Sequence, residues 1–333
     1  MHRKTIFVVS DIHYACAAEQ LRHDHETKVI SNPLLRIAVR FFRHYIWLRE
    51  PMQKNHLLGS FIAKCDEFRR EEVALSAQPI VIANGDYSCD SAFVGVSDDP
   101  AFESATECLN TLRAKFSPDF HAIFGDHELG KTSFFGNRGG MRVASFHRAV
   151  KELGLKPFWK LELGNYILFG VVSSLIALPV FEPDTLPEEL SEWKRLREDH
   201  LREIRDAFDN LKPQQRVILF CHDPSALPFL AEEDSVAKKL GQLEQTIIGH
   251  LHSPLILWKS HRIAGMPPIR FLGTTIKRAT TALQRARHWR QFHVHLCPSL
   301  AGIELLKDGG YLTIDLDLSA QTPARITKHR IQR

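Results

Sequence analysis

Five short motifs rich in aspartate and histidine each come directly after an apolar run of the sequence. They are Asp11-Ile12-His13, Gly85-Asp86, Gly125-Asp126-His127-Glu128, His222-Asp223 and Gly249-His250-Leu251-His252. Carboxylate and neutral imidazole together are good ligands for divalent manganese, iron or zinc. The six cysteines are scattered and include no C-x-x-C pair, which argues against a structural zinc site built from thiolates. The residue types therefore predict a centre of divalent metal ions bound by Asp and His.

The spacing within the motifs also suits ligands that converge on one point. In the D-x-H motif at 11–13 and the H-x-H motif at 250–252, the i, i+2 spacing at the end of a strand places both side chains on one side. Glycine precedes Asp86, Asp126 and His250, where the backbone must turn tightly to bring a ligand inward. Each motif alone is weak, and polar residues that merely cap turns are the alternative. That alternative must explain five matches in order, so the set as a whole is specific.

The apolar runs that precede the motifs have the length and the β-branched content of strands. The pattern predicts strands at 5–10, 79–83, 120–124, 167–172, 217–220, 246–248 and 269–272, and helices at 102–116, 142–153 and 187–211. The alternation of Leu and Ile with Thr and Asp at 311–318 predicts a half-exposed edge strand. Strands alternating with helices indicate an α/β layered fold. Because ligand sites form at the carboxyl ends of strands in such folds, the motifs should converge on one edge of the sheet.

Composition and patterning indicate a single soluble domain. The 333 residues, 44% of them hydrophobic, contain no internal repeat, low-complexity tract or Pro/Gly-rich linker. We therefore expect one domain over 1–333, with an inserted helical segment at about 20–75 and a basic C-terminal extension at about 275–333. The longest apolar runs are far shorter than the roughly 18 residues of a membrane span, and the run at 5–9 is too short for a signal peptide. Scattered cysteines suggest reduced thiols and a cytoplasmic protein.

The ordered set of motifs resembles the calcineurin-like metallophosphoesterase superfamily, whose motifs run D-x-H, G-D, G-N-H-E/D, H and G-H-x-H. The resemblance covers roughly residues 5–252, about three quarters of the chain. It implies a four-layer α/β/β/α sandwich of two mixed β-sheets flanked by helices, and hydrolysis of phosphoesters at a dinuclear metal centre. Two metals can lower the pKa of a water molecule and clamp the phosphate oxygens as charge builds.

The resemblance also implies a role for each residue of the set. One metal would be held by Asp11, His13 and His252, both metals would be bridged by Asp86, and the second would be held by Asp126, His222 and His250. His127 would face the scissile phosphate as general acid or transition-state donor.

Two positions depart from the pattern of the superfamily. Asp126 stands where the family usually has Asn, so it adds a negative charge to the metal site. That charge should tighten metal binding and weaken the attraction for a phosphate. The family often has D-x-x-D around its bridging aspartate, whereas Asp90 follows Asp86 at four residues, and we assign Asp90 no ligand role.

Two basic segments suggest how the substrate or a membrane could be engaged. Residues 33–50 predict an amphipathic helix with Leu34, Ile37, Ala38 and Phe41 on one face and Arg36, Arg40 and Arg43 on another. Such a helix can lie in a membrane interface or form a lid over an acyl chain, and the alternative is an ordinary surface helix packed on the core. The cluster in the C-terminal segment could bind headgroups or be a solvated helix face; it contains Lys277, Arg278, Arg285, Arg287, Arg290, His288, His293 and His295.

The expected function is hydrolysis of a phosphomonoester, phosphodiester or pyrophosphate bond. The substrate would be a phosphorylated small molecule, a nucleotide or a lipid-linked molecule, with peripheral membrane contact through residues 33–50. A nuclease of the same superfamily is the first alternative, but nucleic acid is not expected because a net charge of +4 suggests no continuous basic groove. A non-catalytic protein-binding scaffold is the second alternative, and such a protein should have lost ligands or His127.

Overall fold

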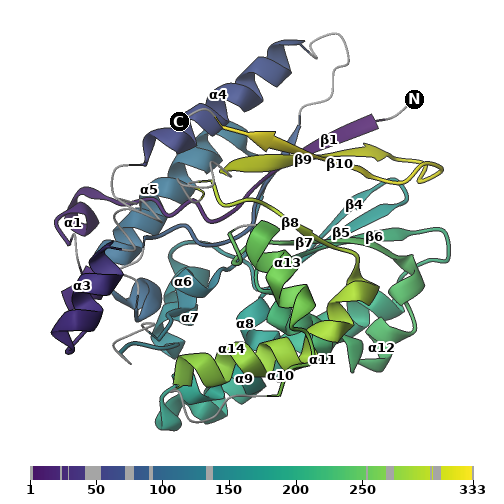
Figure 1. Ribbon diagram of the computed structural model, residues 1–333. Helices are drawn as coiled ribbons and strands as arrows, with labels where there is room; N and C mark the ends of the chain where they lie inside the picture. Colours follow the sequence, from purple (N-terminus) through teal and green to yellow (C-terminus); the bar gives the residue numbers. More distant parts are fainter. Residues whose placement is uncertain are drawn as a thin grey trace.

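Two five-stranded β-sheets lie face to face between layers of helices in the computed structural model (Figure 1). The structure describes residues 3–22, 25–28, 30–41, 54–71, 79–89, 93–132, 138–252, 254–267, 274–300, 302 and 309–331. The first sheet has the order β10-β9-β1-β2-β3 and comprises β1 (Arg3–Val9), β2 (Ile80–Ala83), β3 (Phe120–Ala122), β9 (Gly310–Asp317) and β10 (Arg325–Arg330). The second has the order β4-β5-β6-β7-β8 and comprises β4 (Trp159–Leu163), β5 (Tyr166–Val171), β6 (Arg216–Cys221), β7 (Leu243–Ile248) and β8 (Val294–Leu296).

Both sheets are mixed. Strands β1, β2 and β3 run parallel to one another, β9 pairs antiparallel with β1, and β10 pairs antiparallel with β9. Strands β5 to β8 are parallel, and β4 is antiparallel to β5. Parallel neighbours bring their carboxyl ends to the same end of each sheet.

Helices connect and cover the strands. Between β1 and β2 lie α1 (Ala17–Gln20), α2 (His25–Lys28), α3 (Pro33–Phe41) and α4 (His56–Glu71). The central part contains α5 (Asp99–Phe116), α6 (Asp126–Leu129), α7 (Val143–Lys151), α8 (Ser173–Ile176), α9 (Leu178–Phe181) and α10 (Leu190–Asp209). After β6 come α11 (Leu227–Ala231), α12 (Asp234–Ala237), α13 (Pro254–Arg262) and α14 (Thr274–Arg285). No helix in the described part of the chain is long and apolar enough to cross a membrane.

Alternate residues of the strands pack on opposite faces, which creates the layers. Ile6 and Val8 of β1 belong to a core cluster shared with Phe220 of the second sheet. Phe7 of β1 faces the other way, and its ring contacts that of Phe61 in α4 at a centroid distance of 6.5 Å. On the second sheet, the ring of Phe169 contacts a phenylalanine of α10. Strands covered on both faces read as continuous apolar runs, so the expected four-layer α/β/β/α sandwich is confirmed.

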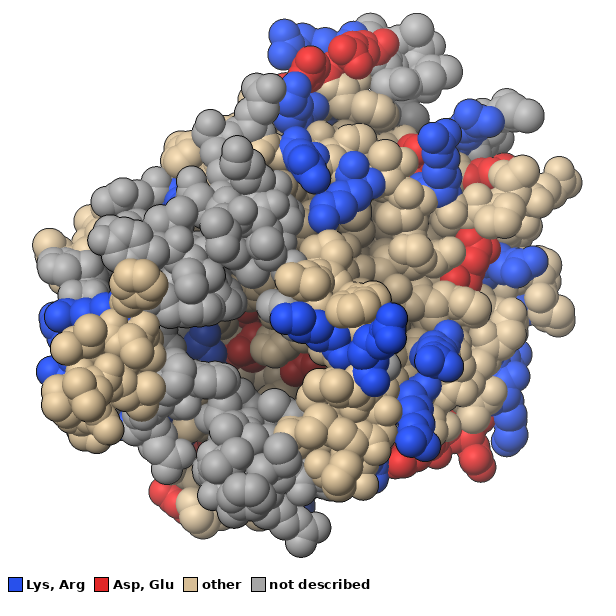
Figure 2. Space-filling model, in the orientation of Figure 1, with Lys and Arg blue, Asp and Glu red and all other residues tan. Residues whose placement is uncertain are grey.

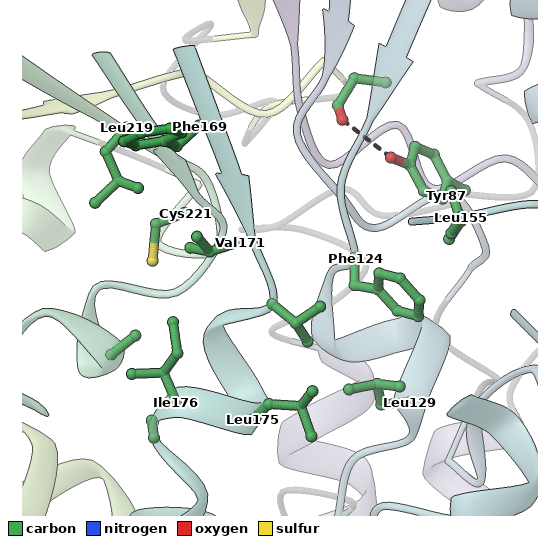
Figure 3. Close-up of a cluster of buried hydrophobic side chains, with 14 of the residues drawn as sticks. Tyr87, Phe124, Leu129, Leu155, Phe169, Val171, Leu175, Ile176, Leu219 and Cys221 are labelled. Atoms are coloured by element: carbon green, nitrogen blue, oxygen red, sulfur yellow. Dashed lines mark hydrogen bonds between the residues drawn. The ribbon is translucent and has the colours of Figure 1, made fainter. Parts of the chain in front are cut away.

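The core continues beneath the carboxyl ends of the strands, as Figure 3 shows. Phe124, Leu129, Val171 and Leu175 are all buried there. The Tyr87 hydroxyl lies 2.6 Å from the carbonyl of Ile123 and 3.0 Å from that of Ala83, so it donates to a strand end. The loops that carry the motifs therefore rest on a packed apolar base.

Most of the predicted elements are present. The strands expected before the five motifs correspond to β1, β2, β3, β6 and β7, and the strand at 167–172 corresponds to β5. The three expected helices correspond to α5, α7 and α10, while the strand expected at 269–272 lies outside the described residues. Strands β4 and β10 were not expected. Residues 294–330, within the expected C-terminal extension, supply β8, β9 and β10 to the two sheets.

The prediction of an edge strand at 311–318 is wrong. These residues form β9, which pairs with β1 on one side and β10 on the other. The polar residues of the alternating pattern are satisfied by neighbouring strands rather than by water. Thr5 donates to Asp315 at 2.8 Å, and the Thr313 hydroxyl lies 2.8 Å from the His329 ring. Polar residues on an interior strand can thus imitate the pattern of an exposed one.

Candidate metal centre

The five motifs meet where the carboxyl ends of the two sheets come together. Strands β1, β2 and β3 of the first sheet lead to residues 11–13, 86 and 126–127. Strands β6 and β7 of the second sheet lead to 222 and 250–252. The expectation of one edge of a single sheet is therefore corrected, because both sheets contribute motifs. Within each sheet, the strands that carry the motifs are neighbours.

Seven of the eight predicted site residues form two clusters of potential ligands that share Asp86. The first cluster is Asp11, His13, Asp86 and His252, and the second is Asp86, Asp126, His222 and His250. Within each cluster the ligand atoms all lie within 4.8 Å of one another. Across the first cluster, His252 Nε2 lies 3.0 Å from Asp11 Oδ1. In the second, His222 Nε2 lies 3.2 Å from Asp86 Oδ2 and 3.3 Å from Asp126 Oδ1.

The donor atoms fit divalent cations. Asp11 Oδ1 and His222 Nε2 are buried and make no hydrogen bond with any residue that the structure describes, although oppositely charged partners lie about 3 Å away. The other ring nitrogen of His222 lies 2.6 Å from the carbonyl of Asn84, and that of His13 lies 3.2 Å from the carbonyl of Ser88. A carbonyl can only accept, so each Nδ1 carries a proton and each Nε2 is the nitrogen that would bind a metal in place of any second proton, the arrangement typical of metal-binding histidines.

The backbone at the candidate ligands adopts a conformation that side chains rarely take. Positive φ angles occur at Asp11 (50°), His13 (50°), Asp86 (59°), His250 (58°) and His252 (58°). In the described part of the chain only His293 and Ala320 share this conformation among residues other than glycine. Each such residue costs about 1–2 kcal/mol relative to ordinary backbone. Strain concentrated on potential ligands is typical of a functional site, because stability alone does not favour it.

Two glycines allow the strand ends to approach closely. A Cβ atom at Gly249 would lie 2.1 Å from Ser10 Oγ and 2.7 Å from Asp11 Oδ2. Gly85 has a φ of 90°, and a Cβ atom there would lie 2.7 Å from the backbone of Gly125. Any larger residue at either position would push these strand ends apart.

Charges within the centre shift the pKa values of its members. Burial by itself raises the pKa of Asp11 and Asp126, but the surrounding histidines hold both well below their ordinary values. The pKa of Asp86 falls to about 2, because His127 and His222 outweigh burial and the repulsion from Asp126. Burial lowers the pKa of His250, yet Asp126 and Asp223 raise it to about 9. The pKa of His222 is raised well above its ordinary value, against burial, by Asp86 and Asp126. In the protein without metal, protons thus occupy positions that cations would take.

His127 lies beside the two clusters and belongs to neither of those found among the described residues. Its Nδ1 lies 2.8 Å from the carbonyl of Cys89, and its Nε2 contacts Lys131 Nζ and lies 3.8 Å from Asp86 Oδ2. The backbone N–H of His127 donates to Asp86 Oδ1 at 3.0 Å. The imidazole is therefore oriented from both nitrogens and placed next to the shared carboxylate.

The acidic neighbours of the motifs have separate structural roles. Glu128 accepts hydrogen bonds from the backbone N–H groups of Gly125, Asp86 and Tyr87 at 2.7, 3.1 and 2.8 Å. It therefore fastens the loop after β2 to the start of α6, and burial and Asp86 raise its pKa to about 7. Asp223 accepts from the N–H of Ser225 at 2.8 Å, and its Oδ2 lies 3.8 Å from His250 Nε2. Asp223 thus caps a turn and also faces a candidate ligand.

Sequence reasoning missed two features of the site. Buried Glu19 of α1 accepts from the N–H of Cys89 at 3.3 Å, on the peptide next to the carbonyl that orients His127. No local signal marks Glu19, because it is brought to the site by the packing of α1. Lys131 could have been found, since it lies one helical turn after His127. The cysteines near the site are buried, and burial raises the pKa of the Cys221 thiol, which keeps it unreactive.

Comparisons with known proteins gave matches only among solved structures. No protein-family model and no curated protein sequence matches the chain. SoxB, a sulfate thiohydrolase from Thermus thermophilus, is 14% identical with a TM-score of 0.45; the match covers 98% of this chain and 56% of SoxB, so the chain spans about half the length of that protein. A calcineurin-like phosphoesterase, YfkN from Bacillus subtilis, is 10% identical over 99% of this chain and 91% of its own, with a TM-score of 0.41.

A third match is the purple acid phosphatase PPD1 from yellow lupin (Lupinus luteus), which is 12% identical over 75% of this chain and 38% of its own, with a TM-score of 0.33. The layered sandwich, with its ordered Asp and His residues at the strand ends, is the fold that the resemblance of the motifs implies.

Proposed function

We propose that the protein is a hydrolase that cleaves a phosphoester or phosphoanhydride bond at a dinuclear metal centre. The observation that carries the proposal is the pair of buried clusters that share Asp86. One divalent ion would be held by the cluster of Asp11 and the other by that of Asp126. Two such ions, when bound, supply Lewis acidity and an activated water for attack on phosphorus.

The protein's own groups would then orient the substrate and handle its leaving group. His127 stands next to Asp86 and outside both clusters, so it is available to a phosphate bound between them. A protonated His127 donates from Nδ1 to the Cys89 carbonyl and keeps the N–H at Nε2 for the leaving oxygen. The buried apolar base under the loops limits movement of these groups during the reaction.

Metal analysis combined with hydrolysis assays tests the proposal. The purified protein should bind two divalent transition metals per chain, and it should hydrolyse an aryl phosphate or a bis-aryl phosphate. Chelation should abolish the activity, and Mn²⁺, Fe²⁺ or Zn²⁺ added one at a time should restore it and identify the preferred ion. Full activity in a preparation that contains no metal would refute the dinuclear mechanism.

We further propose a substrate with an acyl chain, engaged at a membrane surface through α3. The apolar residues of this helix are not packed on the core: Leu34, Ile37 and Phe41 are 77%, 64% and 58% exposed. Only Val39 is buried among the apolar residues of α3. Exposed apolar side chains beside Arg40 suit an interfacial helix. Residues 42–50 of the segment, including Arg43, lie outside the described residues.

The exposed residues of α3 permit a test that spares the fold. Arg36 is a poor target, because its guanidinium donates to the Ile30 carbonyl at 2.6 and 3.0 Å. Leu34→Ser with Ile37→Ser should leave the melting temperature nearly unchanged and weaken binding to liposomes that contain anionic lipid. Val39→Ser is the contrasting variant, since it should lower the melting temperature instead. Equal liposome binding by the double variant and the wild type would argue against a membrane-facing α3.

A further inference from the structure

Lys131 projects from a backbone position that is held on both sides. It follows α6, four residues after His127. Its backbone N–H donates to the carbonyl of Phe93 at 3.1 Å. The next residue, Thr132, is buried and donates its hydroxyl to Asp184 at 2.8 Å. The side chain of Lys131 therefore starts from a fixed point next to the metal centre.

The ammonium group of Lys131 meets the imidazole at the nitrogen that faces the centre. Nδ1 of His127 points to the Cys89 carbonyl, so in the neutral imidazole Nε2 is the acceptor for Lys131 Nζ, and the protonated imidazole that donates to the leaving oxygen would release this contact. Lys131 is only half-buried, so a ligand can reach it. Figure 2 shows a hollow in the surface, with acidic side chains at its floor and Lys and Arg side chains beside them.

The charge balance of the centre favours a positive side chain such as Lys131 beside the substrate. The two clusters contain three carboxylates, those of Asp11, Asp86 and Asp126. Two divalent ions would leave the centre with a net charge of about +1, whereas a neutral residue at position 126 would leave it with about +2. Substrate phosphates carry one or two negative charges, and the attraction between charges a few ångströms apart is strong at a partly buried site. A positive group within reach of the phosphate would restore what Asp126 removes.

We propose that Lys131 binds a phosphoryl oxygen of the substrate beside His127 and supplies the positive charge that Asp126 takes from the centre. The proposal rests on the proposed phosphoesterase function, and it adds a substrate-binding residue that the motifs do not contain. Asp126 begins α6 and Lys131 follows its end, so both charges would act on one ligand bound beside this helix. Lys131→Arg should conserve part of the effect, because arginine also donates to phosphate oxygens.

Binding of inorganic phosphate to the metal-loaded protein tests Lys131 without turnover. Lys131→Met should keep both metals and the melting temperature but weaken phosphate binding, measured by calorimetry, by about 10- to 100-fold, as expected for a lost charge-assisted hydrogen bond. The control is Lys151→Met, which removes the same charge from the exposed end of α7 and should bind phosphate as the wild type does. In assays, the Lys131 variant should raise KM for an anionic substrate more than it lowers kcat.

A double variant tests the link to Asp126. Asp126→Asn together with Lys131→Met should recover phosphate affinity to within about threefold of the wild type at saturating metal, because the two charge changes cancel. Wild-type affinity in Lys131→Met, loss of its metals, or no phosphate binding by the wild type would each overturn the role of Lys131. No recovery in the double variant would overturn the charge compensation. Since phosphate binding is measured without catalysis, these failures are distinguishable from a failure of the hydrolase proposal, which metal content and hydrolysis report.

Discussion

The two halves of the candidate metal centre use the same kinds of ligand. Each half has two carboxylates, one of them from the shared Asp86, and two imidazoles. This match depends on Asp126, because an asparagine there would leave the second half with a single carboxylate. Apart from Asp86, which follows β2, the first half takes its ligands from the ends of β1 and β7, and the second takes them from the ends of β3, β6 and β7.

Nearby carboxylates favour protonation of the histidines in the second half. In the second half, Asp126 Oδ1 lies 3.0 Å from His250 Nδ1 and 3.3 Å from His222 Nε2. The pKa of both histidines is raised, so each tends to hold a proton that a metal must displace. Asp126 therefore strengthens the second half for a metal and for the competing proton alike. The comparison teaches that a carboxylate added to a metal site also favours the proton that competes with the metal.

The largest effect should follow from removing the ligand that the halves share. Asp86→Ala should bind neither metal tightly and should lose activity by about 10³-fold or more, because it removes a carboxylate from both clusters. Elemental analysis and turnover of an aryl phosphate measure this. Asp223→Asn is the control, since it removes a nearby charge without removing a ligand and should keep both metals. Two tightly bound metals in Asp86→Ala would show that the halves are independent.

Replacing His127 should affect the reaction and leave the halves intact. His127→Ala should retain both metals and lower kcat by about 10²- to 10⁴-fold, the range for loss of a general acid. The deficit should be smaller for a nitrophenyl leaving group, which needs little protonation, than for an alkyl one. Elemental analysis and kcat for both substrates measure this. If His127→Ala loses the metals instead, His127 is a ligand and its role here is wrong.

Asp126→Asn should make the halves unequal. The amide oxygen can still reach a metal, but the second metal should bind about tenfold more weakly or worse, and the anionic substrate should bind more tightly. At saturating metal the variant should remain active with a lower KM. A metal titration of both proteins on one substrate checks this. An inactive variant at saturating metal would mean that the carboxylate acts as a proton acceptor or as an obligatory bidentate ligand.

The smallest expected effect is on the pH dependence of metal loading. The raised pKa of His250, about 9, means that the metal-free protein carries this proton below pH 9 and loses it above. Metal affinity of the second half should therefore fall as the pH drops below 9, by about tenfold per pH unit for each proton displaced. Calorimetric titrations at pH 7, 8 and 9 measure the slope. Asp126→Asn should flatten it, and an equal slope in both proteins would contradict the difference between the halves.

Local sequence patterns were sufficient for much of the fold and for the members of the site. The strands before the five motifs were predictable because a buried strand needs a continuous apolar run, and the polar residues after it are conspicuous. The position of residues 311–318 in the sheet was predicted wrongly, because Thr313 and Asp315 form hydrogen bonds with residues of β10 and β1. No local pattern reveals these partners. The surroundings of the helix predicted at 33–50 were left open as well, because periodicity does not say whether an apolar face such as that of Ile37 is covered.

The sequence by itself determined which side chains can bind metal and that they follow strands, since both depend on residue type and local periodicity. Only the tertiary structure decided how these side chains divide into two clusters about Asp86, because the motifs lie on two different sheets. It also decided the left-handed backbone at five candidate ligands. These features arise from the close approach of strand ends that are distant in the sequence. That approach is set by packing between the sheets and not by local conformational preference.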